Sequence, residues 1–258
     1  MGAMNDPVAR FSNRVENYAK YRPSYPSGLV DIFKSDCGLT ETSIIADFGS
    51  GTGILSKLFL QNGNPVIGIE PNAAMRLTAE RLLTNFPNFV SVDGTAEAST
   101  LEAASVGFTT AAQAFHWFDR EKARREFARI LKPGGWAVLI WNERRLDSTA
   151  FLRDYERLLL SYGTDYEKVR HENVTDEIAE FFGPQPFLFK TIENSQRFDF
   201  ESLKGRTRSA SYTPEPGSPD FEPMFAKLEE IFNAHQSDGL VSLEYETKIY
   251  YGQLASLS

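Results

Sequence analysis

Short apolar runs alternate with stretches of helical periodicity through the first 145 residues of the chain. Each run is four to six residues long and suits a buried strand, whereas the stretches between them place apolar residues on one side of a helix. Alternation of this kind is typical of an α/β fold, in which helices cover both faces of a mostly parallel sheet. The predicted strands are residues 43–48, 65–70, 89–92, 110–115 and 136–141.

The pattern changes after about residue 146. Two predicted helices, 151–162 and 175–182, follow each other without a strand between them, and we interpret them as a helical cap inserted into the fold. A long strand over 187–200, a helix over 220–232 and a closing strand over 242–254 complete the chain. The corresponding division has N-terminal helices, one of them over 11–18, then a core, a cap and a C-terminal part of the sheet: 1–38, 39–145, 146–186 and 187–258.

Composition narrows the classes of function. The net charge of −8 argues against nucleic acid as a partner, because affinity for phosphates comes largely from clustered Lys and Arg. Cys37 is the only cysteine, so the chain forms no internal disulfide and no multi-cysteine metal site, and we assign no metal ligand. No apolar run approaches the roughly 20 residues that span a bilayer. We therefore expect a cytoplasmic protein, monomeric or homodimeric, without membrane contacts.

A glycine-rich turn carries the clearest chemical signal. GSGTG (49–53) follows the first predicted strand and precedes a helix, and such a turn lets a ligand approach the backbone closely. Alone it could be a plain loop. However, Glu70 ends the next strand about 20 residues further on, where a carboxylate can accept hydrogen bonds from both hydroxyls of a ribose. The GxGxG spacing differs from the GxGxxG of dinucleotide sites, so a different adenosine cofactor is favoured over NAD.

Five motifs together resemble a known family. DFGSGTG, the Glu70-Pro71-Asn72 tripeptide, GTAE (94–97), FHWF and LKPGG resemble a class I S-adenosylmethionine-dependent methyltransferase of the type 11 kind. The segments YAKYRPSYP and SASYTP are similar to the branch that contains the yeast trans-aconitate methyltransferase. The resemblance implies a Rossmann-like sheet of seven strands, mostly parallel with an antiparallel last strand. It also implies S-adenosylmethionine as cofactor, S-adenosylhomocysteine as product and a small-molecule acceptor.

The resemblance further implies a role for individual residues. Asp47 and the glycine turn would lie under the methionine part of the cofactor, Glu70 would bind the ribose, and Thr95 stands where many relatives carry Asp. The residues expected to contact the cofactor are Tyr18, Arg22, Asp47, Gly49, Ser50, Gly51, Gly53, Glu70, Pro71, Met75, Thr95, Ala96, Glu97, Gln113 and His116. Those expected on the acceptor side are Tyr21, Trp117, Trp141, Asn142 and Arg206.

The nucleophile decides whether a base is required. A carboxylate acceptor is already ionised at neutral pH, whereas a hydroxyl or carbon acid would need a proton acceptor such as His116. His116 has three interpretations at this point: a general base, a wall of the pocket or a packed structural histidine. If the acceptor is a small acid, the candidate cations for its carboxylates are Arg22, Arg144, Arg206 and Arg208. The alternatives are a nucleic-acid or protein methyltransferase and a cofactor-binding protein without turnover.

Overall fold

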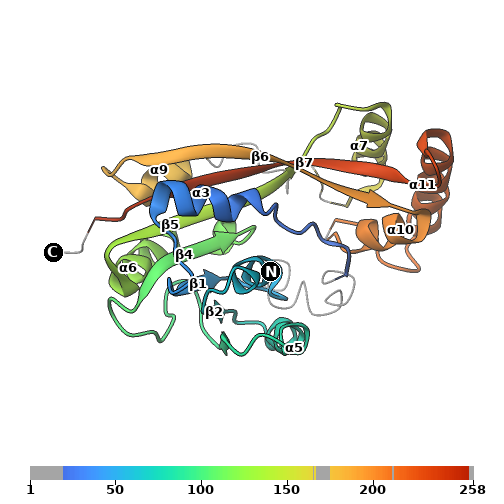
Figure 1. Cartoon of the computed structure of the whole chain (residues 1–258). Helices are drawn as coiled ribbons and strands as arrows, with labels where there is room; N and C mark the ends of the chain where they lie inside the picture. The colour runs from blue at the N-terminus through green and yellow to red at the C-terminus, as the bar shows by residue number, and fades with distance from the viewer. Residues whose placement is uncertain (1–19, 165, 167–174, 211, 256–258) are drawn as a thin grey trace.

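A single twisted sheet forms the centre of the molecule (Figure 1). The computed structural model describes residues 20–164, 166, 175–210 and 212–255. The strands are β1 (Ile45–Phe48), β2 (Val66–Ile69), β3 (Phe89–Val92), β4 (Val106–Ala112), β5 (Leu131–Arg144), β6 (Phe187–Phe198) and β7 (Val241–Gly252). They lie in the order β3-β2-β1-β4-β5-β7-β6, and only β7 runs antiparallel to its neighbours. The predicted seven-stranded, mostly parallel sheet with an antiparallel last strand is confirmed.

Helices connect these strands, and short polar side chains start several of them. Asn72, Asp119, Thr149 and Asp199 each accept a hydrogen bond from a backbone amide in the first turn, which satisfies donors that would otherwise have no partner. The helices are α3 (Gly28–Cys37), α4 (Ile54–Gln61), α5 (Ala73–Leu82), the 3₁₀ helix η1 (Phe115–Trp117), α6 (Arg120–Ile130), α7 (Ala150–Tyr162), α9 (Thr175–Phe182), α10 (Phe200–Arg208) and α11 (Phe221–His235).

Both faces of the sheet are covered by helices, as the sequence predicts for an α/β fold. On one face, α6 and α9 pack on the strands, and the Phe127 ring stacks on Phe48 with 4.2 Å between centroids. On the other face, α3 and α4 bring the stacked rings of Phe33 and Phe59 against the sheet. Successive residues of a strand point to opposite faces, so β1 and β5 supply both layers.

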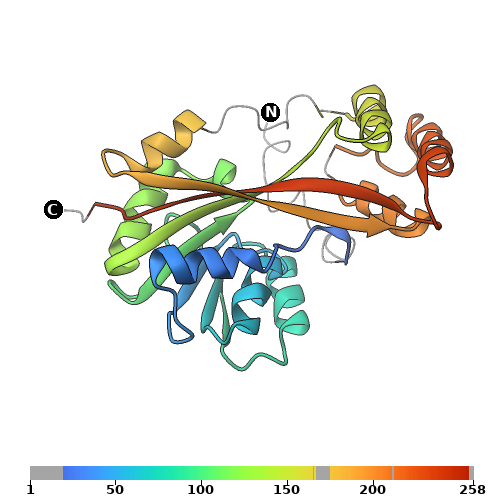
Figure 2. The ribbon, with the colours of Figure 1, turned by 45° about the horizontal axis from the view of Figure 1, so that its top comes forward.

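The three strands β5, β7 and β6 are much longer than the others and project beyond them. They contain 14, 12 and 12 residues, whereas β1, β2 and β3 contain 4 each. Figures 1 and 2 both show α7, α10 and α11 gathered at the projecting end, far from α6 and α9. These three helices bury a separate apolar cluster against the ends of β6 and β7. We call α7, α10, α11 and those strand ends (196–198 and 241–245) the distal lobe.

Some details differ from the sequence prediction. Helix α10 was not predicted, α3 lies in the N-terminal segment that was expected to be helical, and β4 starts at Val106 rather than at residue 110. The segment Lys132–Gly135, which suggests a turn, is the beginning of β5. The two helices of the predicted cap lie apart, because α9 packs with α6 whereas α7 packs with α11. The division of the chain into four segments stays a prediction, and the expected helix over 11–18 lies outside the described residues.

Within the described part of the chain, no helix is both long and apolar enough to span a bilayer.

Candidate active site

The glycine turn after β1 has a backbone that other residues would not tolerate. Gly49 and Gly53 have φ angles of 61° and 81°, in the left-handed region that favours glycine. A Cβ at Gly49 would lie 2.5 Å from the Cβ of Ala114, and one at Gly53 would lie 2.6 Å from Leu83. Gly53 also occupies the N-cap of α4. The turn is therefore fixed by close contacts, and it brings the N-terminus of α4 to the carboxyl edge of the sheet.

Glu70 is held in place by backbone amides. Its Oε2 accepts a hydrogen bond from Gly51 N at 3.0 Å, and its Oε1 accepts one from Asn72 N at 2.9 Å. Burial raises the pKa of the Glu70 carboxyl, although the amides of Asn72 and Gly51 partly oppose this shift. Each oxygen keeps a further lone pair, and the side chain lines a cavity. Glu70, the residue predicted to bind the ribose, is thus held in position by the glycine turn itself.

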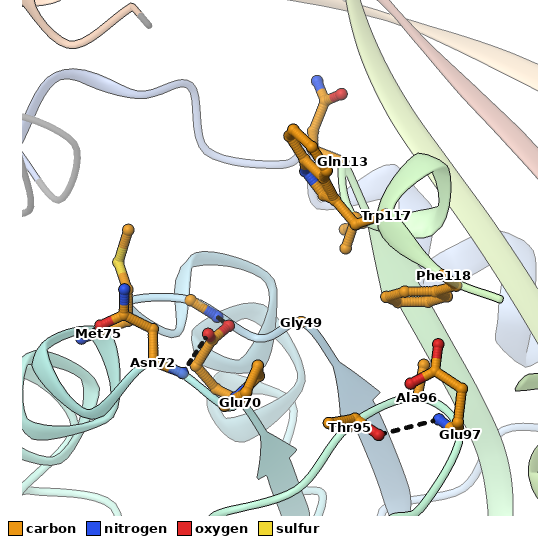
Figure 3. A pocket seen from close by; sticks show the side chains of 14 residues that line it. Gly49, Glu70, Asn72, Met75, Thr95, Ala96, Glu97, Gln113, Trp117 and Phe118 are labelled. Carbon is orange, nitrogen blue, oxygen red and sulfur yellow. Dashed lines mark hydrogen bonds between the residues drawn. The ribbon is translucent and has the colours of Figure 1, made fainter. Parts of the chain in front are cut away.

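A cavity of about 320 Å³ lies between the glycine turn, α5 and η1. In Figure 3, Glu70, Asn72 and Met75 line one side, Trp117 and Phe118 face them, and Thr95 to Glu97 form the floor. Its lining consists of Gly49, Gly51, Glu70, Pro71, Asn72, Met75, Thr95, Ala96, Glu97, Ala112, Gln113, Ala114, Trp117 and Phe118. Nine residues predicted from the sequence to bind the cofactor therefore lie together: Gly49, Gly51, Glu70, Pro71, Met75, Thr95, Ala96, Glu97 and Gln113.

A smaller cavity adjoins the first one at Gly49, Gly51 and Ala112. It is also lined by Asp47 and Ser50, which were predicted, and by Tyr25 and Thr52, which were not. The Asp47 carboxylate is fully buried and accepts hydrogen bonds from Ser56 Oγ at 2.7 Å and Thr110 Oγ1 at 2.9 Å. Burial raises the pKa of Asp47 to about 6. A cation placed in this cavity would favour the ionised carboxylate.

Hydrogen bonds connect the floor of the larger cavity to α6. Asp119 N, at the N-cap of α6, donates to Glu97 Oε1 at 2.8 Å, and Glu97 N donates to the Thr95 hydroxyl at 3.3 Å. Further along, Glu126 of α6 accepts hydrogen bonds from the backbone amide and hydroxyl of Ser99. Burial opposes ionisation of Glu126, but hydrogen bonds from Arg129 and Ser99 lower its pKa, so it stays a carboxylate. The loop is consequently positioned by charge-assisted hydrogen bonds.

The segment QAFHWFD (113–119) divides between cavity and core. Trp117 is 38% exposed and lines the cavity, whereas Phe115 is fully buried. Gln113 has a φ of 57° and turns its side chain away, so that Nε2 donates to the Asn142 carbonyl at 2.9 Å. The His116 ring packs on Trp117 with 4.7 Å between centroids, and its Nδ1 is buried. His116 is absent from the lining of both cavities, which favours the packed structural interpretation over a pocket wall or a base.

The other predicted residues lie around the chain segment 21–25. Arg22 donates to the Ser209 carbonyl at the end of α10, at 3.2 Å, and it does not line either cavity. Tyr21 packs on Gly205 of α10, where a Cβ would lie 2.1 Å from the ring. Asn142 donates to the Ser24 carbonyl at 3.3 Å and accepts from Thr247 Oγ1 at 2.5 Å. Gly53 positions the turn without lining either cavity. Tyr18 lies outside the described residues.

Trp141 is a core residue in this structure. Its ring makes edge contacts with Phe115 and Tyr250, and the side chain is 6% exposed. Alternation along β5 explains this position, because Trp141 and Asn142 point to opposite faces of the sheet. We therefore leave Trp141 out of the acceptor site.

Three of the candidate cations are also placed. The Arg144 guanidinium pairs with Glu156 and donates to Tyr166 Oη at 2.8 Å. Arg208 is exposed and lies over the rings of Phe221 and Phe225. Arg206 is buried in the distal lobe.

Several lining residues were not predicted from the sequence. Asn72 is both the N-cap of α5 and a donor to Glu70, and an Asn directly before a helical stretch is a recognisable capping signal. Phe118 belongs to a quoted motif but received no role. Thr52 belongs to the glycine turn but was given no role, and only the fold brings Tyr25 beside β1. The described residues contain no group of three or more His, Cys, Asp or Glu side chains that could hold a metal ion.

Comparison with known proteins finds methyltransferases. Residues 46–139 match a family model described as a methyltransferase domain, and this range contains every residue that lines the larger cavity. An uncharacterized methyltransferase of Mycobacterium tuberculosis is 35% identical over 191 residues, which cover 74% of this chain and 70% of that protein. The Saccharomyces cerevisiae protein named probable S-adenosylmethionine-dependent methyltransferase CRG1 is 34% identical, over 91% of this chain and 93% of its own length.

Solved structures show the same fold. A structure described as a type II methyltransferase from Anaeromyxobacter dehalogenans has a TM-score of 0.70 at 20% identity, and the match covers 90% of this chain and 98% of that chain. Phosphoethanolamine N-methyltransferase 2 of Haemonchus contortus, solved with phosphomonomethylethanolamine and S-adenosylhomocysteine, has a TM-score of 0.54 at 14% identity. This match covers 93% of this chain and 56% of the other.

Proposed function

The chain belongs to the class I S-adenosylmethionine-dependent methyltransferases, and from this premise we propose that it methylates a small-molecule acceptor at a carboxylate. Methyl transfer and the cofactor follow from the family, whereas the acceptor is our proposal. A cytoplasmic location likewise stays a prediction.

The cavities suit this cofactor. The larger one, about 320 Å³, falls within the range of roughly 300–1,000 Å³ common for small-molecule sites, and its lining is mainly apolar. Glu70 would accept the ribose hydroxyls, while Met75 and Phe118 would pack against the adenine. The adjoining cavity presents the buried Asp47 carboxylate, which suits a cationic amino group. When bound, S-adenosylmethionine supplies a sulfonium whose methyl carbon is open to in-line attack.

One observation carries the carboxylate proposal: the acidic side chains that line the two cavities already accept hydrogen bonds from the protein. Asp47, Glu70 and Glu97 are these side chains, and each has at least one donor. His116 lines neither cavity. With Asp47 and Glu70 assigned to the cofactor, Glu97 is the carboxylate left among these described lining residues to take a proton, whereas a carboxylate nucleophile needs no base at neutral pH.

In this mechanism the protein aligns the reactants and excludes water. Glu70 and the glycine turn would fix one reactant, and Trp117 and Gln113, which line the cofactor cavity, would separate it from the acceptor. Such positioning accounts for large rate enhancements without a chemical participant from the protein.

The test is a screen for methyl transfer from methyl-labelled S-adenosylmethionine to small carboxylic acids, hydroxylated metabolites, an oligonucleotide and a protein extract. We expect label in small acids, in products that release methanol in alkali, as methyl esters do. Transfer to the oligonucleotide or to protein would support the alternative methyltransferase classes. A protein that binds S-adenosylhomocysteine and methylates none of these substrates would favour the hypothesis of a cofactor-binding protein.

A further inference from the structure

An irregular segment, residues 22–25, is held by side-chain amides of the sheet. Asn142 of β5 and Asn194 of β6 both donate to the carbonyl of Ser24, at 3.3 and 2.7 Å. Gln196 of β6 donates to the carbonyl at the start of the segment, at 3.3 Å. In Figures 1 and 2 the chain before α3, drawn in dark blue, runs from this helix towards α10. The segment forms no helix or strand, so these side chains take the place of backbone pairing.

We call Asn142, Asn194 and Gln196 the amide clamp. Asn194 and Gln196 are two residues apart on β6 and therefore point to the same face of the sheet. Asn194 also donates to Asn142 Oδ1 at 3.3 Å, and Thr247 Oγ1 donates to the same oxygen at 2.5 Å. These bonds orient the Asn142 amide, so that its N–H group is directed at the segment. Three amides that converge on one short stretch of backbone fix where its side chains lie.

The clamp brings Tyr25, the last residue of the segment, to the smaller cavity. Tyr25 is half-buried and lines this cavity together with Asp47. Among the described residues it is the one aromatic side chain of that lining. The smaller cavity joins the larger one at Gly49, Gly51 and Ala112. A ligand that reaches from one cavity into the other therefore comes to lie beside Tyr25.

The chemistry of the cofactor decides which of its groups reaches this ring. This inference rests on the proposed function, which places the ribose at Glu70 and the amino group at Asp47. In S-adenosylmethionine the sulfonium lies between those two groups, and the chain that carries the amino group starts at it. The sulfonium is thus expected where the two cavities join, next to the lining that contains Tyr25.

A permanent cation at this point needs an electron-rich neighbour. The carboxylates of Asp47 and Glu70 would be engaged by the amino group and the ribose, whereas the face of an aromatic ring attracts a cation, more strongly where water is excluded. Trp117, which lines the larger cavity, is 38% exposed. Tyr25 lies on the Asp47 side, and hydrogen bonds fix the backbone next to it. Tyr25 is therefore the better placed ring.

We propose that Tyr25 places its ring against the sulfonium of S-adenosylmethionine, and that the amide clamp fixes the ring there. Transfer of the methyl group to the acceptor converts the sulfonium to a neutral thioether, which removes the attraction. The contact therefore favours the cofactor over its product S-adenosylhomocysteine, which the enzyme must release. Tyr25 is a cofactor contact in this proposal, and the residues of the clamp are positioning residues.

The experiment measures affinity for S-adenosylmethionine and for S-adenosylhomocysteine by calorimetry, without an acceptor. Tyr25→Leu should weaken binding of S-adenosylmethionine at least about fivefold more than binding of S-adenosylhomocysteine. Tyr25→Phe, which keeps the ring, and Trp117→Leu should preserve the ratio of the two affinities within about twofold. The control Tyr162→Leu removes a half-buried tyrosine of the distal lobe and should leave both affinities unchanged.

The clamp is tested by the double variant N194A/Q196A, with Glu193→Ala on the opposite face of β6 as control. Removal of both amides should lower the preference for S-adenosylmethionine at least about twofold, because the ring is no longer fixed. In a Tyr25→Leu background the same change should not lower it further. A merely structural role would lower the melting temperature and leave the preference unchanged.

An equal loss of both affinities in Tyr25→Leu would overturn the proposal, because the ring would then contribute packing alone. A preference that falls in Trp117→Leu and not in Tyr25→Leu would overturn it as well. If Tyr25→Leu does not fold, N194A/Q196A decides, and an unchanged preference in that variant counts against the contact. A wild type that binds neither S-adenosylmethionine nor S-adenosylhomocysteine would instead contradict the proposed function itself.

Discussion

The cofactor cavity and the distal lobe bury charges of opposite sign. Beside the glycine turn, Asp47 is buried and Glu70 is half-buried, and within the described part of the chain their carboxylates receive hydrogen bonds from neutral groups. In the distal lobe, Arg206 is buried among tyrosines without a carboxylate partner among the described residues. Each region therefore holds a charged side chain that no oppositely charged side chain among the described residues pairs with directly. A cationic cofactor suits the first region.

The two regions also differ in whether the charge can be lost. Asp47 can be neutralised by protonation near neutral pH, because burial raises its pKa to about 6. Arg206 cannot, since an arginine does not lose its proton in a protein. We therefore expect pH to change the properties of the cofactor cavity strongly and those of the Arg206 site weakly.

The largest effect is expected at Glu70. Glu70→Ala removes the acceptor for two ribose hydroxyls, and hydrogen bonds to a charged group contribute about 1.5–3 kcal/mol each. Calorimetric titration with S-adenosylhomocysteine should show affinity reduced on the order of 100-fold. Glu80→Ala, which removes an exposed glutamate of α5, is the matched control and should bind as wild type does. Undiminished affinity in Glu70→Ala would remove the ribose assignment.

Asp47 should make cofactor affinity depend on pH. Binding of a cationic amino group favours the ionised carboxylate, so below the pKa of about 6 complex formation must release a proton. Affinity for S-adenosylhomocysteine should thus fall by up to about tenfold per pH unit as pH is lowered from 6 to 5. The raised pKa of Glu70 acts in the same direction.

The Asp47→Asn variant separates the contribution of Asp47 to this pH dependence from that of Glu70. The amide cannot titrate, so this variant should bind more weakly at pH 7 and show a flatter pH profile. A profile identical in shape to that of wild type would mean that Asp47 does not face the amino group.

The connection between the two regions is tested at Gly205. Gly205→Ala places a methyl group 2.1 Å from the present position of the Tyr21 ring, which must move. We expect the acceptor KM to rise several-fold while S-adenosylhomocysteine affinity stays within about twofold, because Tyr21 does not line the cofactor cavity. Glu201→Ala on the exposed side of α10 serves as control. In a Tyr21→Ala background, Gly205→Ala should not raise the acceptor KM further. A rise in KM as large as that in the wild-type background would exclude Tyr21 as the cause.

The smallest effect is expected at His116. Because the ring packs on Trp117 and lines neither cavity, His116→Ala should change the single-turnover rate by less than about threefold. Rapid quench with labelled cofactor provides the measurement. A loss of 100-fold or more would make His116 a general base and would require an acceptor that gives up a proton.

The two regions also differ in how far their sequence predicts them. The cofactor cavity is encoded by short stretches of sequence. The geometry of a parallel sheet places the glycine turn after one strand and the carboxylate at the end of the next strand at the same edge. Gly49, Gly51 and Glu70 could therefore be named from this geometry, whereas the roles of the other six predicted lining residues were implied by the family resemblance. The Asn72 cap was readable as well, although its hydrogen bond to Glu70 was not.

The distal lobe depends on contacts between distant segments. Helix α10 contains Gly205 and four charged residues in FESLKGRTR, so its sequence has little helical signal, and packing on α11 and β6 stabilises it. Arg206 and Arg208 look alike in the sequence, yet one is buried and the other is exposed. Trp141 was expected beside the acceptor and lies in the core, because alternation along a strand does not reveal which of its two faces holds a ligand. Burial of this kind is decided by tertiary structure alone.

The most direct test of the account compares small carboxylic acids with their uncharged amides as methyl acceptors at saturating labelled S-adenosylmethionine. If the acceptor is methylated at a carboxylate, label should enter at least one acid as an alkali-labile methyl ester. The matching amide should remain unlabelled. Equal labelling of acids and amides, or labelling of neutral hydroxylated compounds alone, would contradict the account.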